Sequence, residues 1–167
     1  LQAAALDKKE FKLTIESIHL PAMLQACMDQ FTLQVENRGG TIDLNHRLED
    51  PYLEGDVFHL THLFTNLLDN ANKYSPSSPK IRVEVADQGS QLQITIQDEG
   101  VGMNREAVKK IFDKFYRVPT GNVHDVKGFG LGLSYVKTML EAHKGTIQVQ
   151  SEPDKGSTFT INLPKKQ

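Results

Sequence analysis

Residues 80–98 read KIRVEVADQGSQLQITIQD, and this stretch indicates the class of fold. Apolar residues alternate with polar ones in both of its halves, at Ile81, Val83 and Val85 and then at Leu92, Ile94 and Ile96. Strict alternation is typical of strands that bury one face, and the Gln-Gly-Ser between the halves suits a tight turn. We therefore predict a β-hairpin of strands 80–86 and 91–97 with one covered face.

The flanking sequence predicts helices that cover this face. Helical spacing of apolar residues extends over residues 20–37, 56–74 and 131–143, with a capping aspartate or terminal glycines at their ends. Further strands are expected over residues 11–19, 41–48 and 52–54, a second hairpin over 146–150 and 157–163, and a short helix over 104–112. The predicted fold class is α/β (α+β), a two-layer sandwich with helices on one face of a mixed sheet.

Size and charge narrow the classes of function. The 167 residues suit a single domain, and a net charge of -2 without acidic or basic blocks disfavours nucleic acid as a partner. Cys27 lies in an apolar helical stretch, so we expect a buried thiol and a reducing, cytoplasmic compartment. Nothing resembles a signal peptide or a membrane span, and we interpret residues 1–10 as the end of a helix that begins earlier in a longer protein.

The helix at 56–74 has an unusual polar face. Asn66, Asn70 and Lys73 share one face, nearly opposite the apolar residues Phe64, Leu67, Leu68 and Ala71. Asparagine is a weak helix former, so two of them in mid-helix favour a function over a plain solvated surface, which is the alternative. Neutral amide oxygens can bind Mg²⁺ beside phosphate oxygens, and a lysine one turn later can neutralise a triphosphate.

Asp98 is expected to point into the protein. It has the same strand parity as Leu92, Ile94 and Ile96, so its carboxylate faces the buried side. A buried carboxylate needs a donor, and the exocyclic amine of adenine is a suitable one. Gly100 and Gly102 would let the backbone approach a flat ring, with Met103 as an apolar contact. The alternative is that Asp98-Glu-Gly100 forms an ordinary turn.

A glycine-rich segment precedes the helix at 131–143. It comprises Gly128, Gly130, Leu131, Gly132 and Leu133, and it leads into a helix start where free N–H groups favour phosphate. It fits neither a P-loop, which ends in Gly-Lys-Ser/Thr, nor a dinucleotide fingerprint, which follows a strand. The unpatterned residues 118–127 before it are expected to form a lid, hinged near Phe112, Phe115, Tyr116 and Arg117.

Together these segments resemble the catalytic, ATP-binding domain of sensor histidine kinases from bacterial two-component systems. That domain belongs to a wider group that includes gyrase and heat-shock chaperone ATPases, and the resemblance covers residues 11–167. It implies the Bergerat fold, with a mixed five-stranded sheet, three main helices on one face and an ATP lid. The implied ligands are ATP and Mg²⁺.

The resemblance also implies roles for the helix and strand-end residues. It assigns Asn70 to Mg²⁺ and Lys73 to phosphate, with Asn66 and Tyr74 around the metal and phosphates. Asp98, Gly100 and Gly102 match the motif whose aspartate binds adenine.

Three further motifs match the same family. Residues 112–117 match its phenylalanine box, so Arg117 is an expected phosphate contact and, with Asn66 and Lys73, a catalytic residue. Residues 128–133 match its second glycine motif, and residues 156–159 match the last motif, in which Thr158 would lie near the base. Strand parity with the apolar Phe159 conflicts with this role of Thr158.

The family phosphorylates a histidine on a separate dimerisation helix, in a motif that is absent from this sequence. The resemblance therefore implies a chain that binds ATP alone and transfers phosphate only to that helical phosphoacceptor domain, with a response regulator downstream. It implies a monomeric fragment of a homodimeric, membrane-bound parent.

Two other functions remain open. Hydrolases and ATP-driven clamps of the same fold usually carry a glutamate base where Asn66 stands, and a neutral amide cannot take a proton from water. This residue favours a kinase over a hydrolase. A non-catalytic nucleotide-binding module is the third possibility.

Overall fold

The computed structural model describes residues 12–116 and 132–167. Five strands form the main sheet, in the order β2-β4-β5-β7-β6. Their bounds are Thr41–Arg47 for β2, Lys80–Asp87 for β4, Gln91–Asp98 for β5, Thr146–Glu152 for β6 and Gly156–Pro164 for β7. The sheet is mixed, because β2 runs parallel to β4 while the other neighbours are antiparallel. Both predicted hairpins, β4-β5 and β6-β7, are confirmed.

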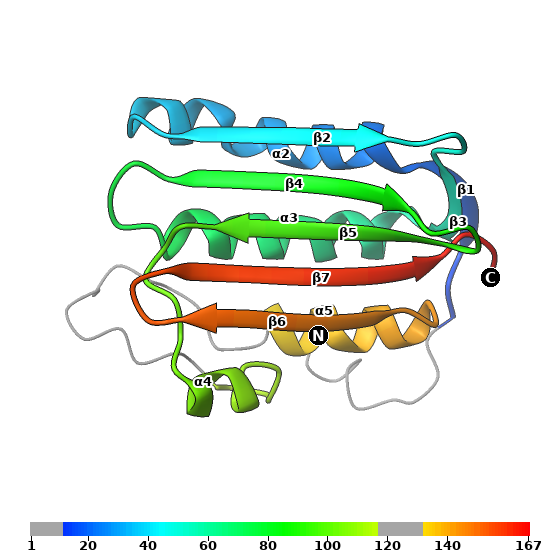
Figure 1. Cartoon of the computed structure of the whole chain (residues 1–167). Coiled ribbons are helices and arrows are strands. Elements are labelled where there is room, and N and C mark those ends of the chain that lie inside the picture. The colour runs from blue at the N-terminus through cyan, green and yellow to red at the C-terminus, as the bar shows by residue number, and fades with distance from the viewer. Residues whose placement is uncertain (1–11, 117–131) are drawn as a thin grey trace.

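Three helices lie against one face of this sheet (Figure 1). They are α2 (Leu20–Asn37), α3 (Val57–Lys73) and α5 (Gly132–Ala142), and a shorter helix, α4 (Arg105–Lys110), lies beside β6. Asp56 caps α3 as predicted, since its Oδ1 accepts a hydrogen bond of 3.0 Å from the His59 amide. The predicted two-layer fold class is confirmed.

The core lies between the sheet and these helices. The apolar face of α3, including Phe64, Leu67 and Leu68, is fully buried against the alternating apolar residues of β4 and β5. Cys27 of α2 is buried too, as predicted. Among the described residues, no helix has both the length and the apolar character that crossing a membrane requires.

One part of the topology differs from the simplest interpretation of the sequence. The strands predicted near residues 41–48 and 52–54 are neighbours in the chain but belong to different sheets. The second of them, β3 (Tyr52–Asp56), pairs with β1 (Ile15–His19) in a separate two-stranded sheet. This small sheet leads directly into α3, so it fixes where that helix begins.

Candidate functional site

Four segments that carry the predicted motifs meet at one end of the sheet, on the left in Figure 1. They are the end of α3, the end of β5 with the loop that follows it, the turn between β6 and β7 and, further in beside the middle of α3, the start of α5. Hydrogen bonds join the first two, because the Tyr74 amide donates to the Asn70 carbonyl at 3.0 Å and the Tyr74 carbonyl accepts from the Val101 amide at 2.9 Å. The amide-bearing helix and the Asp98 loop are therefore neighbours.

The asparagine face of α3 lies next to the start of α5. Asn66 and Asn70 are both half-buried. A Cβ atom built on Gly132 would lie 3.9 Å from Cγ of Asn66, so the first residue of α5 faces this side chain. Leu133 follows, also half-buried. The structure thus brings the second glycine motif to the asparagine helix, as the order of motifs predicts.

Lys73 has a partner on its own helix. Its Nζ lies 2.7 Å from Oδ2 of Asp69, one turn earlier, and both side chains are about one third exposed. This (i, i+4) pairing is visible in the sequence, but our sequence analysis did not include it. The ammonium that is expected to meet phosphate is therefore paired with a carboxylate.

Asp98 is buried, as its strand parity predicts, with 7% of its surface exposed. Burial raises the pKa of Asp98 to about 6, and hydrogen bonds from the amides of Gly100 and Ser157 act in the opposite direction. The bond from Gly100 to Oδ1 is 2.8 Å long. At neutral pH this group is thus an ionised acceptor held in a largely dry position.

The glycines after Asp98 allow close contacts between this loop and the rest of the backbone. A Cβ on Gly100 would lie 2.3 Å from the Tyr74 carbonyl oxygen, and one on Gly102, whose φ is +67°, would lie 1.8 Å from the Glu152 carbonyl oxygen. Both glycines therefore let the loop pack against the protein's own backbone. Met103, at the end of the loop, is buried, and its amide donates to Ser151 Oγ at 2.8 Å.

The structure does not bring Thr158 to this group. Thr158 pairs with Gln97, whereas Asp98 pairs with Ser157, so Thr158 lies on the opposite face of the sheet. Ser157 is 9% exposed, and its hydroxyl lies 2.8 Å from that of Ser151. Ser157 therefore lies on the same face of the sheet as Asp98 and Phe159.

Several predicted residues lie outside the described part of the chain. They are Arg117, Gly128, Gly130 and Leu131, together with the expected lid at 118–127 and residues 1–10. At the edge of that gap, Phe112 and Tyr116 pack against the core, and Lys137 Nζ lies 5.8 Å from the centroid of the Phe112 ring. Phe115 is 66% exposed.

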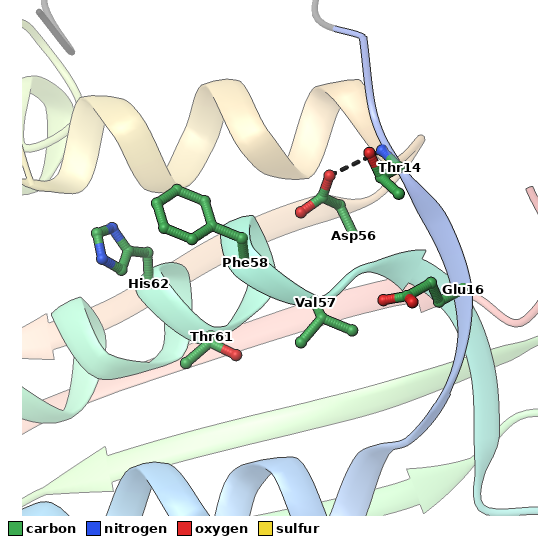
Figure 2. A pocket seen from close by; sticks show the side chains of 7 residues that line it. All are labelled: Thr14, Glu16, Asp56, Val57, Phe58, Thr61 and His62. Atoms are coloured by element: carbon green, nitrogen blue, oxygen red, sulfur yellow. Dashed lines mark hydrogen bonds between the residues drawn. The ribbon is translucent and has the colours of Figure 1, made fainter.

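A pocket of about 610 Å³ lies at the opposite end of α3, near its first turn. Figure 2 shows its lining residues, Thr14, Glu16, Asp56, Val57, Phe58, Thr61 and His62. Asp56 has a structural role, because its two carboxylate oxygens accept hydrogen bonds from the amides of His59 at 3.0 Å and Thr14 at 2.8 Å. Two carboxylates make this pocket unsuited to a polyphosphate.

Comparisons with known proteins agree with the fold. Residues 55–167 match the family model described as "Histidine kinase-, DNA gyrase B-, and HSP90-like ATPase". The sensor protein RprX of Bacteroides fragilis is 41% identical over 98% of this chain, and the sensor histidine kinase WalK of Bacillus subtilis is 34% identical over 100% of it. The alignments cover 32% and 28% of those proteins, so the chain spans about a third of their length.

Solved structures show the same fold. The catalytic domain of histidine kinase ThkA, in a nucleotide-free form, superimposes with a TM-score of 0.81 at 21% identity over 93% of this chain and all of that one. Full-length ShkA in complex with AMPPNP gives a TM-score of 0.83 at 22% identity, over 96% of this chain and 33% of that one.

Proposed function

Because this chain belongs to the family of histidine kinase-, DNA gyrase B- and HSP90-like ATPases, we propose that it binds Mg·ATP where α3, β5 and α5 meet. We propose further that it is the catalytic domain of a sensor histidine kinase, with residues 11–167 forming the domain. Its γ-phosphoryl acceptor would be a histidine on a separate helical domain of the parent protein.

The burial of Asp98 beside the asparagine helix is the observation that supports this proposal most directly. An ionised carboxylate in a largely dry position is costly unless it accepts hydrogen bonds, and adenine offers an amine. Two backbone hydrogen bonds through Tyr74 connect this group with Asn70. A base contact and a metal-phosphate contact are thus available to one small molecule.

The donor set of α3 fits Mg²⁺ bound to phosphates. Amide oxygens are hard, neutral ligands, so Asn70 can bind the ion, with Asn66 beside it, without adding charge to a polyanionic ligand. When bound, the ion supplies charge neutralisation at the phosphates. Lys73 would leave Asp69 and pair with a phosphate, because the ligand carries more negative charge than one carboxylate.

Arg117, Gly128, Gly130 and Leu131 are proposed to complete the phosphate contacts. Ser157, rather than Thr158, is proposed as the neighbour of the base, since it pairs with Asp98 across the sheet. The amide of Asn66 cannot act as a general base, which favours transfer to a histidine over hydrolysis by water. A response regulator would then receive the phosphoryl group, and the parent protein is proposed to be a membrane-bound homodimer.

Two measurements test the proposal. Calorimetric titration of ATP with and without Mg²⁺ should give a Mg²⁺-dependent affinity, and Asn70→Ala should remove most of that dependence. Exposed Asn45→Ala, on β2, is the matched control and should keep it. If the wild-type chain does not bind ATP, the proposed site is wrong.

The reaction is tested with γ-labelled ATP and a separately prepared acceptor-helix domain. Transfer of label to histidine supports the kinase. Steady release of phosphate without transfer would indicate a hydrolase or clamp, and binding without either reaction would indicate a non-catalytic module.

A further inference from the structure

The arginine that follows α2 makes hydrogen bonds to the last turn of α3. The guanidinium of Arg38, which follows α2, donates from Nη1 to Asn72 Oδ1 at 2.8 Å and to the Asn72 carbonyl at 3.1 Å, and from Nη2 to the Ser75 carbonyl. The final carbonyls of a helix are unpaired and carry partial negative charge, so a cation is favourable here. Asn72 is only 2% exposed, and Arg38 explains how a buried amide on this helix is satisfied.

The turn that carries Arg38 is itself fixed against the same segment. The Gly40 amide donates to the Val35 carbonyl at 2.9 Å, and the next amide, that of Thr41, donates to the Pro79 carbonyl at 2.8 Å. A Cβ on Gly40 would lie 2.1 Å from the Pro79 carbonyl oxygen, so the two backbones are in close contact. The guanidinium therefore has a defined position relative to residues 72–79.

The opposite side of this segment supports the Asp98 loop. Tyr74 lies between Asn72 and Ser75, the two residues that Arg38 holds, and its carbonyl accepts the Val101 amide at 2.9 Å. A Cβ on Gly100 would lie 2.3 Å from that carbonyl oxygen. Any movement of the end of α3 must therefore be transmitted to the backbone on either side of Gly100.

From these contacts we propose that Arg38 is a positioning residue for the nucleotide site. By fixing residues 72–75, it sets the position of the Tyr74 carbonyl on which the Asp98 loop rests. It also keeps Lys73 and Asn70 in register with that loop. This inference rests on the proposed function, because it concerns recognition of adenine by Asp98.

The test replaces Arg38 by methionine, which keeps an unbranched apolar stem and removes the hydrogen-bonding fork. Amide hydrogen exchange at Val101 reports the loop directly, and it should become faster while exchange at core amides such as that of Ile94 stays slow. ATP affinity should fall roughly tenfold, on the scale of one charge-assisted hydrogen bond, with GTP affinity falling less. Guanine has an oxygen where adenine has the amine, so the ratio of the two affinities reports the Asp98 contact.

Three further samples sharpen the test. Arg82→Met, at an exposed position of β4, is the matched control and should leave both readouts unchanged. Arg38→Lys keeps the positive charge but lacks the forked guanidinium, and it should show an intermediate effect. If the methionine variant does not fold, the lysine variant takes its place in the test. Added methylguanidinium should restore part of the ATP affinity of a folded Arg38→Ala variant.

Wild-type protection of Val101 together with an unchanged ATP to GTP ratio in Arg38→Met or Arg38→Lys would overturn the proposal. A uniform acceleration of exchange across the whole chain would overturn it as well, since Arg38 would then only stabilise the fold. Because exchange at Val101 is measured without nucleotide, it tests the Arg38 contact even if the wild-type chain proves not to bind ATP.

Discussion

Asp98 and Ser157 are direct partners in the register of β5 and β7, so both side chains lie on the helix-covered face of the sheet. Burial raises the pKa of Asp98 to about 6, and only the ionised form accepts the adenine amine on either oxygen. We therefore expect the affinity for ATP to fall as the pH is lowered through about 6. Calorimetry over this range on the wild type and on Asp98→Asn measures the effect.

The asparagine variant is the control for the titration of ATP itself. The affinity of this variant for ATP should be weak at every pH, and it should change with pH only because ATP itself takes up protons. A constant ratio of wild-type to variant affinity between about pH 5 and pH 7 would contradict the role of the Asp98 carboxylate.

The same burial predicts that Asp98 costs stability. The folded-state pKa lies above 3.8, the ordinary value for an aspartate, so the folded protein binds more protons, and its stability falls as the pH rises through this window. At neutral pH, Asp98→Asn should raise the free energy of unfolding by up to about 3 kcal/mol, the equivalent of a shift of about two pKa units. Below about pH 4 the difference between wild type and variant should disappear. Urea unfolding at several pH values measures both, and an Asp98→Asn variant that is less stable at neutral pH would contradict the prediction.

Local sequence patterns predicted the helices and strands of this fold, but they did not predict which distant strands pair with each other. The spacing of apolar residues predicted α2 over residues 20–37 and both hairpins, because each of these patterns lies within one continuous segment of the chain. The family model that matches residues 55–167 confirms the predicted ATPase family. The pairing of β3 with β1 was not predicted, because any exposed strand edge could have accepted β3.

The site was predictable to the extent that its residues lie on one element. The parity of Asp98 along its strand predicted its burial correctly. The role of Thr158 was predicted from the motif, whereas the parity of its own strand places its side chain on the opposite face from Asp98. The hydrogen bonds from Arg38 to Asn72 join residues far apart in the sequence, and no local period signals such a contact. The glycines of the Asp98 loop were expected from their motif, but the backbone they contact is visible only in the fold.

The pair Asp69–Lys73 predicts a competition for the lysine. Asp69→Asn frees Lys73 Nζ, which lies 2.7 Å from Asp69, and so should strengthen ATP binding severalfold. Lys73→Met should weaken it by roughly tenfold, as expected for one charge-assisted phosphate contact. Stability should change by less than about 1 kcal/mol in both, because the pair is exposed.

Glu106→Gln is the matched control, since it removes the carboxylate of another (i, i+4) pair, with Lys110 on α4. It should leave ATP affinity unchanged. Weaker binding by Asp69→Asn would indicate that Asp69 orients the lysine or binds the metal.

Replacement of Gly102 and of Gly89 by alanine should have contrasting effects on stability. Both have positive φ, at +67° and +81°, but a Cβ would lie 1.8 Å from the Glu152 carbonyl oxygen at Gly102 and would meet nothing within 4 Å at Gly89. Gly89→Ala should cost about 1 kcal/mol of backbone strain. Gly102→Ala should cost several kcal/mol more, because the loop must move off β6. Equal melting temperatures would show that the loop can move away from Glu152 freely.

His143 predicts a loss of stability in acid. Its Nδ1 donates to the Met139 carbonyl at 2.7 Å and its Nε2 accepts from the Asp56 amide at 3.0 Å, so the neutral ring joins α5 to the start of α3. Burial lowers the pKa of His143, against the opposing effects of the Met139 carbonyl and the Asp56 carboxylate, while His59 adds to the lowering.

Since the folded-state pKa is below the unfolded one, the unfolded chain binds more protons in acid, and stability is lost as the pH falls below about 6.5. We expect the free energy of unfolding to decrease as the pH is lowered from about 7.5 to about 5.5. His143→Gln can keep one donor and one acceptor but cannot titrate, so its stability should depend less on pH. His46→Gln on the exposed edge of β2 should retain the wild-type slope. Equal slopes for His143→Gln and the wild type would assign the acid sensitivity to other groups.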